Sequence, residues 1–189
     1  RRAAIEARLG AVIDVRRICV RDRSRRRAVE VPAELVTDDP YELIDDPLLD
    51  VVVELVGGVE PACEYILAAL RSGKHVVTAN KAVLAERGAE IFATAAEHKR
   101  ALYFEGSVAG GIPVLRSLRE GLASDRIDAV AGIVNGTSNF ILDAMTRSGA
   151  DFAEALRGAQ AAGYAEADPA LDVSRSEERR VGKECATLC

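Results

Sequence analysis

The chain has 189 residues, of which 49% are hydrophobic, and a formal net charge of −5 at pH 7. This length suffices for one sizeable domain, or for one domain and part of another, and the acidic balance gives no reason to expect a nucleic-acid partner. No apolar stretch approaches the roughly 20 residues of a membrane-spanning helix, and the opening RRAAIEARLG lacks the apolar core of a signal peptide. Cysteines without CxxC spacing fit a reduced, cytoplasmic protein.

The first half of the chain alternates strand-like and helix-like segments, which is typical of a parallel α/β sheet. Residues 1–9 predict a helix that ends at Gly10, a residue suited to the left-handed position after a helix. A strand is expected at 15–20, before a basic loop. The short, β-branched run DVVVEL at 50–55 predicts a strand that is buried on both faces.

The next segments carry clear helix and strand signals. Residues 60–73 place Pro61 near the start of a helix and Gly73 after its end. The pattern then predicts a strand at 74–79, a helix at 81–99 and a strand at 101–105. Four strands alternating with helices and loops predict a Rossmann-like doubly wound parallel sheet. Such a fold begins with a strand and a GxGxxG turn, and neither is present, so we expect that the first strand is missing by truncation.

A second, incomplete domain of α+β type is expected after Glu105. Its patterns predict a helix at 111–122, a strand at 126–134, and helices at 135–149 and 151–163. Thr137 or Ser138 is the expected N-cap of the third of these elements, and Asp151 that of the fourth. The final residues, SRSEERRVGKECATLC at 174–189, continue no earlier pattern, and we expect them to be a non-native tail.

Ligands of doubly wound sheets gather at the carboxyl ends of the strands, where this sequence places several candidates. Arg21 ends the strand at which a dinucleotide-binding fold meets the adenosine ribose; an acidic residue there favours NAD, whereas arginine favours NADP. The order VRD contains both residue types, and a solvated basic loop is the alternative. Gly57 and Gly58 either let a cofactor approach the backbone closely or form only a tight turn.

Lys81 follows the strand at 74–79 and is the candidate for catalysis. A desolvated lysine can polarise a carbonyl or stabilise an alkoxide, as hydride transfer requires, although a solvated lysine at a helix start has the same spacing. In FEGSVAGGIPV, Glu105 and the carbonyls of the glycine-rich bend can coordinate a hard cation, or the segment is only a crossover loop. The carboxylates of GYAEADPALD suit a substrate ammonium, or they are simply solvated.

Five segments, taken together, resemble motifs of the homoserine dehydrogenases. In chain order they are VVVELVGG, GKHVVTANKA, FEGSVAGGIPV, VNGTSNFIL and GYAEADPALDV. The resemblance covers residues 11–173, and the combination is specific although each motif alone is not. It implies an enzyme that interconverts L-homoserine and L-aspartate 4-semialdehyde with NAD(P), on the route to threonine, methionine and isoleucine. It also implies a homodimer in which NGTSNF lies beneath the substrate and helps to form the dimer contact.

The same resemblance implies roles for individual residues of this sequence. Lys81 lies between nicotinamide and substrate and is the implied catalytic residue. The implied cofactor-binding residues, for NADP or NAD, are Arg21, Gly57, Thr78, Lys81 and Gly163. Glu166 is expected to bind the amino group of homoserine, and Asp172 is a second substrate-binding residue. The implied ligands of a sodium ion are Glu105 and the carbonyls of Val108, Gly110 and Ile112.

The resemblance also divides the chain and marks where the family pattern stops. It implies an NAD(P)-binding domain at 1–106, the start of a catalytic and dimerisation domain at 107–173, and the tail at 174–189. Beyond Asp172 the expected substrate-binding aspartate falls at Glu177 and the proton-donating lysine at Val181, so we expect a fragment with little or no activity. Two alternatives stay open: another two-domain NAD(P)-dependent amino-acid or aldehyde reductase, and a non-catalytic binding module.

Overall fold

Three parallel strands form the main sheet of the computed structural model, which describes residues 2–130, 132 and 135–165. The strands are, in spatial order, β3 (Val51–Glu54), β4 (His75–Thr78) and β5 (Leu102–Tyr103). Their register places Val53 opposite Val77, and Val77 opposite Tyr103. Two further strands, β1 (Ile18–Cys19) and β2 (Val36–Thr37), pair in parallel in a separate sheet. The predicted parallel α/β class is therefore confirmed, with the strands divided between two sheets.

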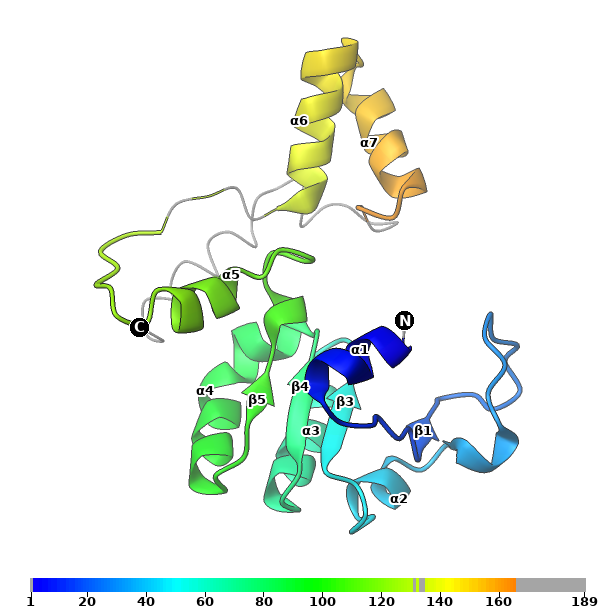
Figure 1. Ribbon diagram of the computed structural model, residues 1–189. Helices are drawn as coiled ribbons and strands as arrows, with labels where there is room; N and C mark the ends of the chain where they lie inside the picture. The colour runs from blue at the N-terminus through cyan, green and yellow to red at the C-terminus, as the bar shows by residue number, and fades with distance from the viewer. Residues whose placement is uncertain (1, 131, 133–134, 166–189) are drawn as a thin grey trace.

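Two crossover helices cover one face of the main sheet (Figure 1). Helix α3 (Ala62–Arg71) links β3 to β4, and α4 (Lys81–Glu97) links β4 to β5. In α3, Ile66 and Leu70 are four residues apart and so lie on one side of the helix, where both are fully buried with Val76 of the sheet. Each such side chain contributes roughly 1.5–3 kcal/mol by leaving water, so this layer is the core of the domain.

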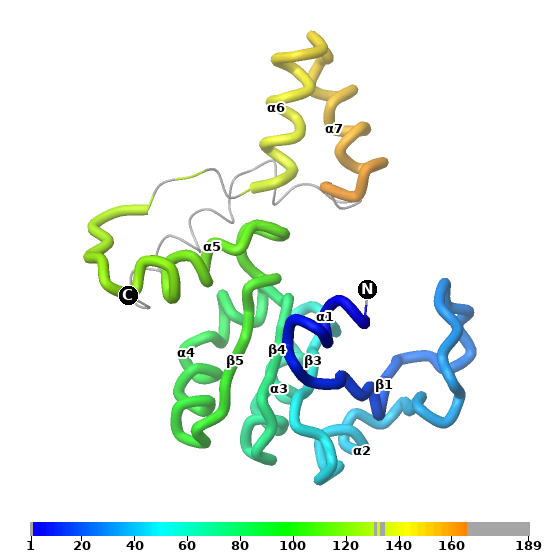
Figure 2. Tube along the Cα trace, viewed as in Figure 1, coloured from blue at the N-terminus to red at the C-terminus, as the bar shows by residue number. Residues whose placement is uncertain are grey.

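Shorter elements surround this layer. They are α1 (Arg2–Leu9), the 3₁₀ turn η1 (Ala33–Leu35), α2 (Pro40–Ile44), the 3₁₀ turn η2 (Glu105–Ser107), α5 (Val114–Arg116) and the π-helical turn η3 (Ser117–Gly121). Two helices follow, α6 (Gly136–Ser148) and α7 (Phe152–Ala161), which pack on each other around Ile141, Ala155 and Ala159. Figures 1 and 2 show this pair standing apart from the main sheet. Among the described residues, no helix combines the length and apolar character needed to cross a membrane.

The prediction that β3 is buried on both faces is wrong. Val52 and Glu54 are buried, whereas Val51 and Val53 are 47% and 59% exposed. Tyr103, which is in register with Val53 through Val77, is 61% exposed on the same face. The reason is that α3 and α4 cover only the face of Val52, and α1 buries none of its own residues.

The elements predicted before Glu105 occur in the structure, although β1 is only two residues long instead of spanning 15–20. After Glu105 the predictions are less accurate. The helix expected at 111–122 is divided into α5 and η3. Residues 126–130 form no strand, because no strand among the described residues pairs with them; positions 131 and 133–134 lie outside the described residues.

The N-cap of α6 was assigned to the wrong residue. Asn135, not Thr137 or Ser138, caps the helix, because its side chain accepts a hydrogen bond from the Ser138 backbone N–H at 2.8 Å. The Thr137 hydroxyl instead donates to the Tyr164 carbonyl at 2.6 Å. The predicted cap of α7 is confirmed, since the Asp151 carboxylate accepts from the Glu154 N–H at 2.8 Å.

Candidate functional site

The carboxyl edge of the main sheet brings together candidate residues from three loops. Because β3, β4 and β5 are parallel, the segments that follow them begin at the same edge. These segments carry Gly57 after β3, Thr78 and Lys81 at the end of β4 and the start of α4, and Glu105 after β5. The expectation that the candidate loops share one edge is therefore confirmed for the loops after β3, β4 and β5, but not for Arg21, which follows β1 of the separate sheet.

Lys81 is the first residue of α4, and its position is determined by the residue before it. Asn80 is the N-cap: its Oδ1 accepts from the Val83 backbone N–H at 3.2 Å. Its Nδ2 donates to the Gly58 carbonyl at 2.7 Å, which ties the start of α4 to the turn after β3. The Lys81 side chain is exposed to solvent at this edge, where it also makes at least one bonding or electrostatic contact with the protein. A capped helix start thus presents the lysine beside the glycine turn.

The turn after β3 requires glycine. Gly57 and Gly58 have φ angles of +79° and +70°. These lie in the left-handed region, which residues with a Cβ adopt only at a cost in free energy. Nothing lies within 4 Å of a Cβ built on either residue, so the requirement comes from the backbone conformation and not from crowding. The turn is consequently open to solvent on the side where a Cβ would stand.

Glu54 is a site residue that the sequence reasoning missed. It ends β3 and is only 4% exposed, yet its carboxylate is fully hydrogen-bonded within the chain, to the turn before Gly58 and to Thr78 of the neighbouring strand. The available signal was the alternation in VVVE, which places Glu54 on the same face as Val52. A polar residue on a buried face at the carboxyl end of a strand is itself an indication of a site.

Glu105 serves as a backbone cap in this structure. Its two carboxylate oxygens accept hydrogen bonds from the N–H groups of Leu115 and Arg116, each at 3.0 Å. These backbone N–H groups at the start of α5 lack an acceptor within the helix, and Glu105 supplies one. Within the described ranges no group of three or more His, Cys, Asp or Glu side chains could hold a metal ion. The expected sodium ligands are of another kind, one carboxylate and three carbonyls. Such oxygen donors fit a hard cation, and each carboxylate oxygen keeps a further lone pair.

The carbonyl donors expected beside Glu105 lie in the loop that follows η2. Val108 ends that turn, and Gly110 has a φ of +59°. The Ile112 carbonyl accepts from the Val114 N–H at 2.8 Å. The loop is attached to β4, because the Ser107 hydroxyl donates to the Thr78 carbonyl at 3.0 Å. The four expected sodium ligands therefore share one short segment at the carboxyl edge.

Arg21 lies after β1, on the smaller sheet, so the structure places it in a different loop from Lys81. The loop is ordered by Asp22, whose carboxylate accepts from the Ser24 hydroxyl at 2.6 Å and from its N–H at 2.8 Å. The Ser24 hydroxyl is the main reason why the pKa of Asp22 is lowered. Arg27 donates to the Asp22 carbonyl at 2.7 Å and closes the loop.

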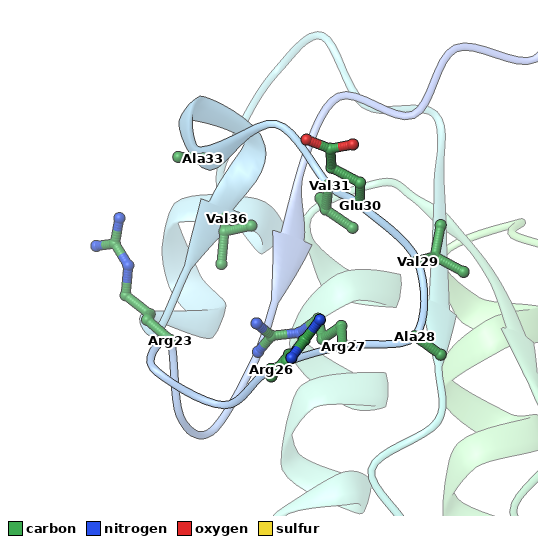
Figure 3. A pocket seen from close by; sticks show the side chains of 9 residues that line it. All are labelled: Arg23, Arg26, Arg27, Ala28, Val29, Glu30, Val31, Ala33 and Val36. Atoms are coloured by element: carbon green, nitrogen blue, oxygen red, sulfur yellow. The ribbon is translucent and has the colours of Figure 1, made fainter.

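A cavity of about 590 Å³ lies within this basic loop (Figure 3). It is lined by Arg23, Arg26, Arg27, Ala28, Val29, Glu30, Val31, Ala33 and Val36. Three arginines against a single glutamate make it a region of net positive charge, which suits an anionic group. The sequence indicated the charge of this loop but not that the loop borders an open pocket.

Gly163 belongs to the helical pair and not to the sheet edge. It follows α7 with a φ of +78°, and its N–H donates to the Gln160 carbonyl at 3.1 Å. The next residue, Tyr164, stacks on Phe140 of α6 with ring centroids 5.1 Å apart, and this contact holds the turn against the start of α6. The two expected substrate-binding residues, Glu166 and Asp172, lie outside the described residues.

Comparisons with known proteins match this chain over both of its parts. Residues 3–105 match the family model "Homoserine dehydrogenase, NAD binding domain", and residues 113–180 match the model "Homoserine dehydrogenase". The homoserine dehydrogenase of Bacillus subtilis is 49% identical over 172 residues, which are 91% of this chain and 40% of that protein. The homoserine dehydrogenase of Corynebacterium glutamicum is 52% identical over 166 residues, 88% of this chain and 37% of that protein.

Solved structures give the same match. A homoserine dehydrogenase from Thiobacillus denitrificans aligns with a TM-score of 0.78 at 48% identity, covering 90% of this chain and 39% of that chain. A hyperthermophilic archaeal homoserine dehydrogenase in complex with NADPH aligns with a TM-score of 0.66 at 30% identity, covering 78% of this chain and 46% of that chain. The chain thus spans about two-fifths of the length of the curated relatives above, and its Rossmann-like NAD-binding domain followed by the start of a catalytic domain is confirmed.

Proposed function

The chain belongs to the homoserine dehydrogenase family, and we propose that it supplies the NAD(P)-binding domain and part of the catalytic domain of an enzyme that interconverts L-homoserine and L-aspartate 4-semialdehyde. The observation that carries the proposal is the position of Lys81, at a capped helix start on the carboxyl edge of the sheet. That edge is where ligands of open parallel α/β sheets bind. The family match argues against an unrelated reductase.

Lys81 acts on the reacting oxygen of the substrate in this proposal. Its ammonium group donates a hydrogen bond to that oxygen, and it stabilises the negative charge that develops when the carbonyl becomes an alkoxide. A bound NAD(P) supplies the hydride acceptor or donor. Glu166 would anchor the substrate ammonium and Asp172 would be its second polar neighbour, so that the substrate is oriented before reaction.

We further propose that the cofactor is NADP in preference to NAD. The support is the positive charge of the loop after β1, where Arg21 is followed by the arginine-lined cavity, and the NADPH complex formed by an archaeal relative. Gly57, at the open glycine turn, is a further proposed cofactor contact. Thr78 is 1% exposed and donates its hydroxyl to Glu54, so its proposed contribution is to hold this edge in place. Gly163 would contact the cofactor from the helical pair. Arginine donates two parallel hydrogen bonds to the oxygens of a phosphate. A ribose without that phosphate has no such pair of acceptor oxygens.

The experiment that tests the cofactor proposal is titration of the chain with NADPH and NADH, followed by nicotinamide fluorescence. We expect tighter binding of NADPH, and an Arg21→Ala variant is expected to lose roughly tenfold in NADPH affinity with little change for NADH. Arg8→Ala, in the exposed helix α1, is the matched control. Equal loss for both cofactors in Arg21→Ala would remove the assigned role of this arginine.

Sodium, dimer formation and location complete the proposal. Sodium binds Glu105 and the carbonyls of Val108, Gly110 and Ile112, while the carboxylate also caps α5. Exchange of sodium for potassium at constant ionic strength is then expected to lower the melting temperature.

The intact enzyme is a cytoplasmic homodimer that serves threonine, methionine and isoleucine synthesis. The 189-residue chain alone is expected to turn over little homoserine, because valine occupies position 181, where the proton-donating lysine is expected.

A further inference from the structure

Glu54 is a buried acidic residue at the proposed cofactor-binding edge. Its side chain points toward the face covered by α3 and α4 and is 4% exposed. Burying a carboxylate is unfavourable unless hydrogen bonds replace those it made to water. The bonds that replace water therefore indicate what the residue holds in place.

Two of these bonds come from the glycine turn. Oε1 of Glu54 accepts from the Val56 N–H at 2.6 Å and from the Gly57 N–H at 3.3 Å. Successive backbone N–H groups in a left-handed turn form a concave site that attracts anions, as in phosphate-binding loops. In this chain an internal carboxylate already occupies that site.

The other oxygen of Glu54 connects the turn to the neighbouring loops. Oε2 accepts from the Thr78 hydroxyl at 2.6 Å, and the Thr78 Oγ1 accepts in turn from the Asn80 N–H at 3.0 Å. Asn80 donates back to the Gly58 carbonyl at 2.7 Å. The result is a closed ring of hydrogen bonds through β3, the glycine turn, β4 and the start of α4. A shift of Glu54 would move the residue that precedes Lys81.

We propose that Glu54 is a positioning residue of the cofactor site: its buried carboxylate occupies the anion-binding N–H groups of the turn at 56–58, so that this turn receives an uncharged part of the dinucleotide and not a phosphate. The inference rests on the proposed function. Negative charge beneath the turn repels phosphate, whereas ribose hydroxyls and a carboxamide donate hydrogen bonds. The class of ligand at this turn is therefore a neutral hydrogen-bond donor.

The first test needs no dinucleotide. Inorganic phosphate is titrated into the full ¹⁵N-labelled chain while the amide signals of Val56 and Gly57 are followed by NMR. We expect both signals to stay fixed in the wild type and to shift with phosphate in Glu54→Ala, because that change frees the two N–H groups. Phosphate-dependent shifts of these amides in the wild type would overturn the inference.

The second test uses NADPH affinity. Glu54→Gln keeps one acceptor oxygen but loses the charge, and Glu54→Ala loses both; we expect about a threefold and a tenfold weaker affinity, respectively. Glu97→Gln, at the exposed end of α4, is the matched control and should change nothing. If Glu54→Ala does not fold, the Glu54→Gln variant decides between the outcomes. The inference would be contradicted if Glu54→Gln binds NADPH as tightly as the wild type and its Val56 and Gly57 amide signals stay unchanged as phosphate is added. If the wild type binds no NADPH, the cofactor proposal fails, and the phosphate titration still judges Glu54.

Discussion

At the scale of single residues, backbone conformation and hydrogen bonding at the sheet edge decide which side chains matter. The glycines at 57 and 58 were identified from the sequence because a buried strand ended on them. Glu54 was missed because the run DVVVEL was interpreted as an apolar strand, and because its partner on the neighbouring strand, the hydroxyl of Thr78, is visible only once β3 and β4 are paired. Residue type can therefore mark a turn, whereas a buried polar network requires the pairing of distant segments.

Gly57→Ala tests whether the turn depends on backbone conformation alone. Gly57 has a φ of +79° with nothing within 4 Å of an added Cβ, so only the left-handed conformation opposes the substitution. We expect a loss of about 1–2 kcal/mol in the free energy of unfolding, measured by urea denaturation. Gly111→Ala is the control, since Gly111 also has open space but no positive φ. A Gly57→Ala variant as stable as Gly111→Ala would show that the turn has another conformation.

At the scale of elements, the accuracy of the sequence predictions depended on whether the signals were local. Helices α3 and α4 were predicted closely because apolar spacing lies within the element, and end signals such as Pro61 and Gly73 lie next to its ends. The strand expected at 126–134 failed in its described part because alternation does not reveal whether a neighbouring strand exists. The cap of α6 was misplaced by two or three residues, since the sequence NGTS offers three side chains capable of capping.

Asn80 has two separable functions in α4, and substitution can distinguish them. Asn80→Ala removes both the cap on Val83 and the bond to the Gly58 carbonyl, so we expect a loss of about 1–2 kcal/mol in the free energy of unfolding. Asn80→Asp keeps the capping oxygen but cannot donate to Gly58, and a smaller loss is expected. Thermal denaturation followed by circular dichroism measures both. Equal losses in the two variants would mean that the cap contributes nothing to the stability of α4.

At the scale of the whole molecule, the described residues cover the main sheet on one face only. The uncovered face carries Val51, Val53 and Tyr103, whereas α3 and α4 pack on the opposite side. The sequence suggested burial on both faces because a run of apolar residues does not show how many layers the fold supplies. The α/β class and the shared edge of the loops were nonetheless predictable, because both follow from the order of strands and helices.

Two neighbouring valines test this asymmetry. Val52 is 8% exposed and Val53 is 59% exposed on the opposite face. Val52→Thr buries a hydroxyl in an apolar layer, so we expect a loss of roughly 1–3 kcal/mol in the free energy of unfolding, whereas Val53→Thr is expected to stay within about 0.5 kcal/mol of the wild type. Urea denaturation of the two variants gives the comparison. A larger loss for Val53→Thr would mean that another element covers this face in solution.

The most direct measurement of the proposed function is homoserine oxidation by a chimera, in which residues 11–173 replace the matching segment of the Bacillus subtilis homoserine dehydrogenase. We expect NADP-dependent activity on L-homoserine, and a loss of roughly 100-fold or more in kcat for Lys81→Ala, because the charge that stabilises the alkoxide is gone. Lys99→Ala, beyond the far end of α4, is the control and should retain activity. A Lys81→Ala chimera as active as the Lys99→Ala chimera would contradict the assignment of Lys81 to the reaction.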